Sequence, residues 1–201
     1  WFISPSMPTS FIYKTVQIGE KGGNQFWSVN KLFVEYFKKN SYKNLKNLIE
    51  RWKKNPIFKK RMKIFRDCLS ILKNVKNSIN PSNLVLPTLI AQIDGIQTEF
   101  MIKNGLYYDI GRRGWKNRMG RIIQKKSWFL NQTLNSELLD QANDLCLNIL
   151  FQESFPGTPL NNSFVTFSRH KILHGEYLRY GRIDNTIRAF LILDFLVELT
   201  N

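Results

Sequence analysis

The chain has 201 residues, and it is poor in three kinds of residue on which many protein functions depend: it has two cysteines, two histidines and 15 acidic side chains against 30 Lys and Arg. Cys68 and Cys146 lie far apart in apolar helical patterns, which excludes a disulfide framework and a CxxC metal pair and favours a reducing, cytoplasmic setting. No apolar run reaches roughly 18 residues, because Asp194 and Glu198 interrupt the strongest one. We therefore expect no membrane partner.

The sequence also lacks the motifs of several large enzyme classes. It has no phosphate-binding glycine loop of the Walker or Rossmann type and no Gly-x-Ser-x-Gly motif. The segment from His170 to His174 has no glutamate in the place that an HExxH zinc site requires, and no third zinc ligand can be assigned. We expect neither a metal nor another cofactor.

Positive charge is what the chain has in excess: its formal net charge is +15 and its pI is near 9.9. A polyanionic partner, either a nucleic acid or an anionic membrane surface, is the commonest explanation of such an imbalance. The alternative is that the charge only keeps the protein soluble. Docking on a membrane is disfavoured, because the basic helical faces have no strong apolar counter-face outside the core.

Residues 1–80 are predicted to be an irregular arm followed by a basic helical region. Prolines and glycines punctuate residues 1–25, where we expect at most a short extended piece at 11–18. Apolar spacing then predicts a helix at 26–37, a second one capped by Ser41, and a third at about 57–78 with Pro56 in its first turn. The third helix has a cationic face: Lys59, Lys60, Arg61, Lys63 and Arg66.

Residues 81–201 are predicted to form a second helical domain. A helix at 84–103 is apolar nearly all round, and Asp94 on its apolar face needs a hydrogen-bond or cationic partner. Further expected helices are one at 138–151 capped by Ser136, one that starts at Asn162 or Ser163 and ends at Gly175 in a left-handed cap, and one at 185–199 capped by Asp184. No strand pattern competes after residue 25, so the predicted fold class is all-α, a helical bundle.

A segment at 106–121 breaks the helical spacing, and cations alternate with aromatic rings along it. Cations for phosphates and flat rings for bases are what single-stranded RNA binding requires. The alternative interpretation is a solvated connection with Trp115 packed into the core. The Gly111-Arg-Arg-Gly114 stretch has the GxxG form of a KH-domain loop, but we interpret it as a plain glycine turn because no strands are expected beside it.

Both histidines of the chain lie in one short stretch, directly after Arg169. On a regular helix Arg169 and His174 are about 7.5 Å apart along the axis and about 140° apart around it, whereas His170 and His174 share a face. Cleavage of RNA without metal needs a base, an acid and positive charge on the phosphorane oxygens. Arg169 and His174 could supply charge and proton transfer. Alternatively, each histidine is a capping or hydrogen-bonded core residue.

The pattern Arg169-His170-x-x-x-His174-Gly175 resembles the RX4-6H signature of the HEPN superfamily. The resemblance continues through Arg179-Tyr180-Gly181 and the segment from Asn185 to Asp194, and the helix around Asp94 is similar to an earlier central helix of such domains. It covers about residues 81–201. It implies a helical bundle that dimerises around a shared cleft, with endoribonuclease activity that leaves a 2′,3′-cyclic phosphate.

By position in that motif, Arg169 would stabilise the scissile phosphate, His174 would be the acid and base, and His170 would orient or assist. Asp94, or alternatively Glu176, is the expected supporting carboxylate. The residues expected to bind RNA are Arg112, Arg113, Trp115, Lys116, Arg118, Arg121, Lys171, Arg179, Tyr180 and Arg182.

The function predicted from the sequence is thus cleavage of RNA, either tRNA or mRNA, by a homodimer that acts as an anti-phage or toxin effector and that an inhibitory or sensor protein could control. The alternative is a module of the same fold that binds RNA or a partner without turnover, as some HEPN domains do.

Overall fold

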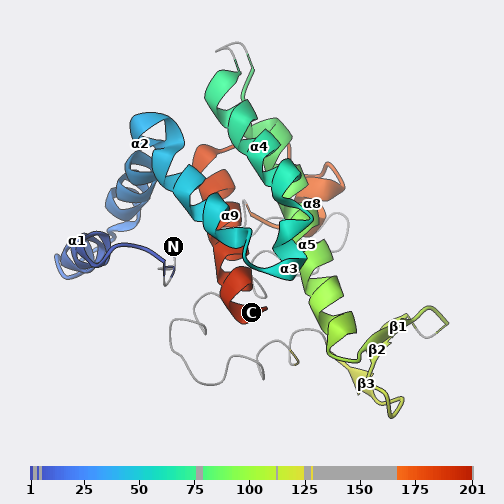
Figure 1. Cartoon of the computed structure of the whole chain (residues 1–201). Coiled ribbons are helices and arrows are strands. Elements are labelled where there is room, and N and C mark those ends of the chain that lie inside the picture. The colour runs from blue at the N-terminus through green and yellow to red at the C-terminus, as the bar shows by residue number, and fades with distance from the viewer. Residues whose placement is uncertain are drawn as a thin grey trace.

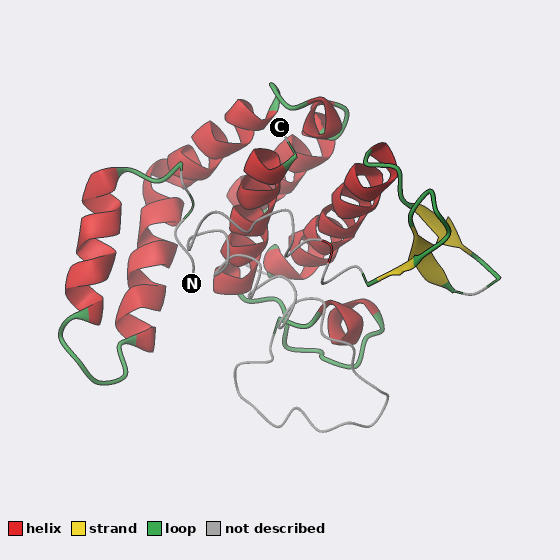
Figure 2. Ribbon diagram, turned by 90° about the horizontal axis from the view of Figure 1, so that it is seen from below, coloured by secondary structure: helices red, strands yellow, loops and turns green. Residues whose placement is uncertain are grey.

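A computed structural model describes residues 1, 4, 6–75, 79–111, 113–124, 128 and 167–200. Over these ranges the chain is mostly helical with one small sheet, so the expected helical class is confirmed and the expected absence of strands is wrong (Figures 1 and 2). Several predicted features lie outside the described residues: Cys146, Arg112, the helix at 138–151 with its cap Ser136, and the start of a helix at Asn162 or Ser163.

Two long helices form the centre of the fold, α5 (Ser82–Lys103) and α9 (Ile183–Leu199), which pack against each other (Figure 1). Residues 184–197 of α9 are all buried, since neighbouring helices cover it on several sides. The helices α2 (Phe26–Trp52) and α4 (Met62–Asn74) pack against each other, α2 also against α9 and α4 against α5. The predicted central helix at 84–103 is therefore confirmed, and α9 shares its central place.

The prediction of an extended piece at 11–18 is wrong, because these residues lie in helix α1 (Thr9–Gly19). Its β-branched residues favour strands, but tertiary packing outweighs that preference. Phe11 is buried, with its ring centroid 4.9 Å from that of Phe33 and 4.3 Å from that of Tyr36 on α2. Packing of this one apolar face on α2 stabilises the helical conformation of an otherwise exposed segment.

Helix α2 contains a break near the predicted boundary at Ser41. Asn40, Ser41 and Tyr42 have φ angles of 50°, 50° and 62°, in the left-handed region, which costs roughly 1–2 kcal/mol for each residue. The side chain of Asn44 donates a 2.9 Å hydrogen bond to the Tyr36 carbonyl across this break. A boundary near Ser41 is therefore confirmed. The prediction that Ser41 is the N-cap of a second helix is wrong, because its backbone is left-handed and not extended.

The predicted helix at 57–78 is divided into α3 (Pro56–Lys59) and α4. Asn55 caps α3, because its side-chain oxygen accepts from the backbone N–H of Ile57 at 2.9 Å. Its side-chain nitrogen donates to the α9 carbonyl of Val197 at 3.3 Å, and Asn55 is fully buried. This tertiary bond fixes α3 on α9, and α4 starts as a separate helix after Arg61.

A three-stranded antiparallel sheet follows α5: β1 (Tyr107–Asp109), β2 (Gly114–Lys116) and β3 (Ile122–Ile123), in that order. It projects from the end of α5, away from the helical body (Figures 1 and 2). Strands of two or three residues are too short to show an alternating pattern, which is why the sequence did not predict them. Strands therefore flank the turn at 111–114, contrary to the expectation.

One hydrophobic core joins the two regions that were predicted to meet near residue 80. Trp52, at the end of α2, donates its indole N–H to the buried Asp194 carboxylate of α9 at 2.8 Å. The hydroxyls of Ser4 and Ser6 also donate to that carboxylate. Residues 1–80 thus cover α9 directly. Among the described residues, no helix has the length and apolar composition to cross a membrane.

Candidate active site

The motif residues lie on helix α8 (Arg169–Leu173), which is little more than one turn long. Arg169 is its first residue, because Ser168 before it has an extended backbone (φ −83°, ψ 123°). His174 is the C-cap. Gly175 follows with φ +73° and donates its N–H to the Ile172 carbonyl at 3.3 Å, which confirms the predicted left-handed cap. The short helix places Arg169 at one end and His174 at the other.

Asp94 of α5 binds the arginine of the motif. Its Oδ2 lies 3.1 Å from Nη2 of Arg169, and the two side chains are about one third exposed (32% and 38%). The sequence predicted that Asp94 needs a cationic or hydrogen-bonding partner, and the structure provides one from a residue 75 positions away. This ion pair holds α8 on α5 and restricts the guanidinium to the α5 side of the motif.

The two imidazole rings contact each other. The ring centroids of His170 and His174 are 4.3 Å apart, with the planes tilted by 45°. Nε2 of His170 also lies 3.9 Å from Oε1 of Glu176, just beyond the C-cap. His170 is partly exposed, and His174 is exposed. Both rings are therefore accessible to a ligand, and their spacing is the i, i+4 spacing expected from the sequence.

We call Asp94, Arg169, His170, His174 and Glu176 together the α8 cluster. It combines a guanidinium, a group that binds phosphate oxygens in a forked geometry, with two imidazoles, a group that can either accept or donate a proton. The cluster also contains the carboxylates of Asp94 and Glu176, which the sequence indicated as alternatives for a supporting role. Asp94 contacts Arg169, and Glu176 lies near His170, so each supports a different member of the motif.

The expected RNA-binding residues near the motif differ in accessibility. Lys171 is only 6% exposed, so its position argues against a phosphate contact. Arg179 is exposed. Tyr180 is half-buried, and its hydroxyl donates to the Asn83 carbonyl at 3.3 Å, which joins this loop to the start of α5.

Arg182 and Asp184 form a bidentate ion pair, with donor to acceptor distances of 3.0 and 2.8 Å. Asp184 was predicted to cap α9, but it lies in the first turn of that helix and is buried. It also accepts from Arg188 at 3.3 Å, one helical turn further on. Arg182 therefore stabilises the first turn of α9 through its ion pair with Asp184.

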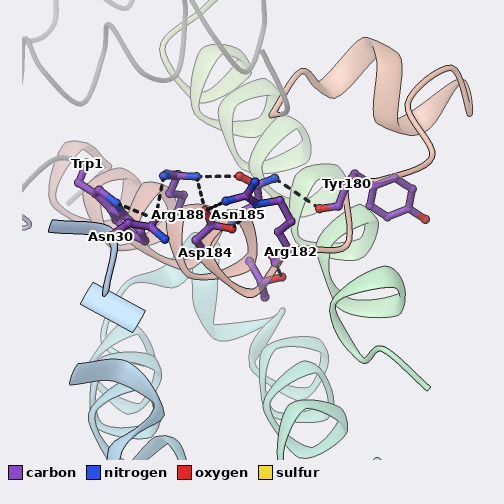
Figure 3. A network of polar contacts seen from close by, with 8 residues as sticks. Trp1, Asn30, Tyr180, Arg182, Asp184, Asn185 and Arg188 are labelled. Carbon is purple, nitrogen blue, oxygen red and sulfur yellow. Dashed lines mark hydrogen bonds and ion pairs between the residues drawn. The ribbon is translucent and has the colours of Figure 1, made fainter. Parts of the chain in front are cut away.

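Figure 3 shows Arg188 at the centre of this network. Its guanidinium is 2.8 Å from Oδ1 of Asn185 and 3.3 Å from Oδ1 of Asn30 on α2, and it lies 4.4 Å from the ring centroid of Trp1. Burial lowers the pKa of Arg188, and the adjacent Asp184 opposes that shift. Burial raises the pKa of Asp184, but hydrogen bonds and charges from Arg182 and Arg188 outweigh it, so the pKa is below its usual value. The feature of the sequence that could have indicated this network is the spacing of Asp184 and Arg188, which lie four residues apart at the start of an apolar run.

The cationic face predicted at 59–66 is largely neutralised. Lys60 and Arg61 contact the Glu99 carboxylate of α5 at 2.6 and 2.9 Å. Burial raises the pKa of Glu99, but the hydrogen bonds and the positive charges of these two cations together outweigh it, so the pKa is below its usual value. Further pairs on this face join Lys63 to Asp67 at 2.9 Å and Arg66 to Glu50 at 2.8 Å. This face is therefore a weaker candidate for binding a polyanion than its cations alone suggested.

The residues expected to bind RNA at 106–121 are divided between surface and interior. Arg113, Arg118 and Arg121 are exposed. Lys116 is 8% exposed and pairs with Asp109 at 2.5 Å, so it is an improbable phosphate ligand. Trp115 is half-buried against the core, as the alternative interpretation of this segment predicted.

The fold and the α8 cluster thus define a helical protein with an accessible arginine and histidine site. Over the described ranges, no three His, Cys, Asp or Glu side chains converge in a way that could hold a metal ion. No protein-family model matches the chain, and no curated protein or solved structure matches it significantly.

Proposed function

We propose that the chain is a HEPN-type endoribonuclease that cleaves RNA without a metal ion and leaves a 2′,3′-cyclic phosphate. The observation that carries the proposal is the arrangement on α8: Arg169 opens the helix and is held by Asp94, and the rings of His170 and His174 on the same helix have their centroids 4.3 Å apart. The resemblance of the motif to the RX4-6H signature gives this arrangement a specific chemistry.

The proposed reaction moves two protons and exchanges one bond at phosphorus. One imidazole takes the proton of the 2′-hydroxyl, O2′ bonds to phosphorus, and the bond from phosphorus to O5′ breaks as O5′ receives a proton. His174, the more exposed ring, performs acid and base transfer, and His170 orients it or assists. Arg169 stabilises the negative charge of the phosphorane oxygens. These roles need positive charge and proton transfer in one active site. The proposal is supported by the guanidinium that Asp94 holds at the start of α8 and by the two imidazoles that contact each other on the same short helix.

The resemblance further implies that two copies bring their motifs to a shared cleft. We propose a homodimer that cuts tRNA or mRNA in the cytoplasm as an anti-phage or toxin effector, under control of an inhibitory or sensor protein. The net charge of +15 supports a polyanionic substrate. It also favours an acidic surface on any inhibitory partner.

The proposed reaction is tested by the ends that it leaves. Purified protein incubated with single-stranded RNA in EDTA is expected to give fragments with a 2′,3′-cyclic phosphate and a 5′-hydroxyl, because the 2′-oxygen is the nucleophile. RNA with a 2′-O-methyl group at every position is the control, and it should remain intact. Binding of RNA with no cleavage under any condition would favour the non-catalytic binding module instead.

Asp94→Asn is expected to lower kcat by about 10- to 100-fold with a smaller change in KM, because the amide retains the shape but weakens the hold on Arg169. Asp94 acts through Arg169 and is therefore a positioning residue. Glu99→Gln is the matched control, since it also removes a carboxylate from α5, at a side chain that pairs with Lys60 and Arg61. Equal effects of the two substitutions on kcat would contradict the positioning role.

A further inference from the structure

The β-sheet after α5 carries an excess of cations. Residues 107–123 contain five Lys and Arg side chains and a single carboxylate, that of Asp109. Asp109 pairs with the buried Lys116, so its negative charge balances that of Lys116 and not that of the exposed arginines. Arg118 and Arg121 are exposed at the turn between β2 and β3. The outer part of the sheet is therefore strongly positive.

The turn that carries these arginines is held by its own hydrogen bonds. The Asn117 side-chain oxygen accepts from the backbone N–H of Met119 and of Arg121, each at 3.0 Å. Gly120 has φ +73°, a left-handed conformation that closes this turn without strain. Such a turn presents its cations in a fixed place, which lowers the entropy lost when they contact phosphates.

An aromatic ring and an apolar side chain are exposed on one face of the sheet. Tyr107 pairs in register with Lys116, and Lys116 with Ile122, so these three share a face. Lys116 is buried, whereas Tyr107 is 46% and Ile122 is 68% exposed. A half-exposed ring on β1 and exposed arginines in the β2–β3 turn of the same small sheet offer both a stacking surface and phosphate ligands. We call Tyr107, Arg118, Arg121 and Ile122 the sheet platform.

The sheet platform is joined firmly to the helix that carries Asp94. After α5 ends at Lys103, Gly105 adopts φ +80°, and Leu106 donates its N–H back to the α5 carbonyl of Met101 at 3.1 Å. A Cβ at Gly105 would lie 2.8 Å from Nε of Arg118, so this arginine packs close to the junction, and the φ of +80° is what favours glycine there. Lys103 lies nine positions after Asp94 on α5, which is a rise of about 14 Å along the helix.

We infer that the sheet platform is the docking surface for a single-stranded stretch of the RNA substrate, next to the segment that is cut. Tyr107 stacks on a base, and Arg118 and Arg121 contact phosphates. This inference rests on the proposed ribonuclease function. A single strand is the form that exposes base faces for stacking, whereas the bases of a duplex are stacked on each other. The helix α5 sets the distance from the platform to the α8 cluster.

The test measures binding of a fluorescein-labelled single-stranded RNA of about 12 nucleotides, within the span that one single-strand-binding domain covers. All variants carry His174→Ala, which is expected to slow turnover so that binding can be measured on intact RNA. Arg118→Ser with Arg121→Ser is expected to reduce the slope of log affinity against log salt by about 1.4, since two phosphate contacts are lost. The charge-matched control is Lys38→Ser with Lys43→Ser on α2, where both lysines are exposed.

Tyr107→Ala is expected to weaken binding by roughly 5- to 150-fold, the range measured for loss of one stacked base. Tyr13→Ala is the control, because Tyr13 on α1 is 63% exposed and lies outside the sheet platform. Circular dichroism confirms that each variant is folded. The inference is overturned if each control weakens binding as much as its platform variant, or if duplex RNA binds as tightly as the single strand.

Failure of this inference and failure of the proposed function give different results. If the wild-type chain cuts RNA but the platform variants bind as well as their controls, the sheet platform is not the docking surface and the ribonuclease proposal stands. If the platform variants lose affinity but no cyclic-phosphate ends form, the sheet binds RNA and the catalytic proposal fails.

Discussion

Replacing His174 with Ala is expected to lower the rate of RNA cleavage by about 100- to 10,000-fold, because the imidazole is the proposed acid and base. The effect should appear mainly in kcat, since His174 lies at the exposed end of α8 and acts on protons that move in the transition state. Single-turnover cleavage of a labelled RNA in EDTA measures it. Because the side chain is exposed, the free energy of unfolding should change by no more than about 0.5 kcal/mol.

His174→Asn is the matched variant for this experiment. Asparagine keeps a polar side chain at the C-cap of α8 but cannot transfer a proton near neutral pH. The same loss of rate in both variants, with unchanged thermal stability, assigns the effect to proton transfer. An undiminished cleavage rate in folded His174→Ala would reject the proposed mechanism.

Asp184→Ala is expected to lower the free energy of unfolding by about 3–5 kcal/mol, because it leaves the buried guanidinium of Arg188 without its carboxylate. Denaturant titration followed by circular dichroism measures the change. The control is Glu50→Ala, which removes an ion pair with Arg66 at the surface and should cost less than about 1 kcal/mol. Adding Arg188→Met to Asp184→Ala should recover part of the loss, since no buried charge then remains. A cost for Asp184→Ala no larger than that of the control would refute this account of the network.

The same ion pair predicts how stability depends on pH. The pKa of Asp184 is lower in the folded protein than its usual value of 3.8. A depressed carboxyl pKa contributes stability that is fully present above 3.8 and is lost as the pH falls through the folded value. The difference in unfolding free energy between wild type and Asp184→Asn should therefore shrink as the pH falls below about 3.8.

The helices that the sequence predicted well are those with long, regular apolar spacing. The central helix at 84–103 agrees closely with α5, and the left-handed cap at Gly175 follows from glycine's freedom at positive φ. Two errors came from segments with weak local signals. Residues 11–18 are helical because Phe11 packs on α2, and β1 to β3 are two or three residues long. Local propensity decides neither case. The helix at 11–18 is stabilised by contacts with α2, and the sheet by pairing between neighbouring strands that are each too short to show an alternating pattern.

The candidate site could be located from the sequence because Arg169, His170 and His174 lie within six residues of one another. Their partners could not be located in the same way. Asp94 was chosen because a carboxylate on an apolar face needs a partner, but its pairing with Arg169 depends on how α5 packs on α8. The burial of Lys171 likewise depends on tertiary structure and not on its place in the motif.

The sequence by itself determined the helical class, the excess of positive charge and the spacing of the motif residues, because each of these depends on residue type and local order along the chain. Tertiary structure decided which charges are compensated: it paired Arg169 with Asp94, neutralised Lys60 and Arg61 with Glu99, and left Arg118 and Arg121 exposed on a sheet. The physical reason is that the free energy of a charged side chain depends on its solvent and its nearest opposite charge, and both are set by residues far away in the sequence.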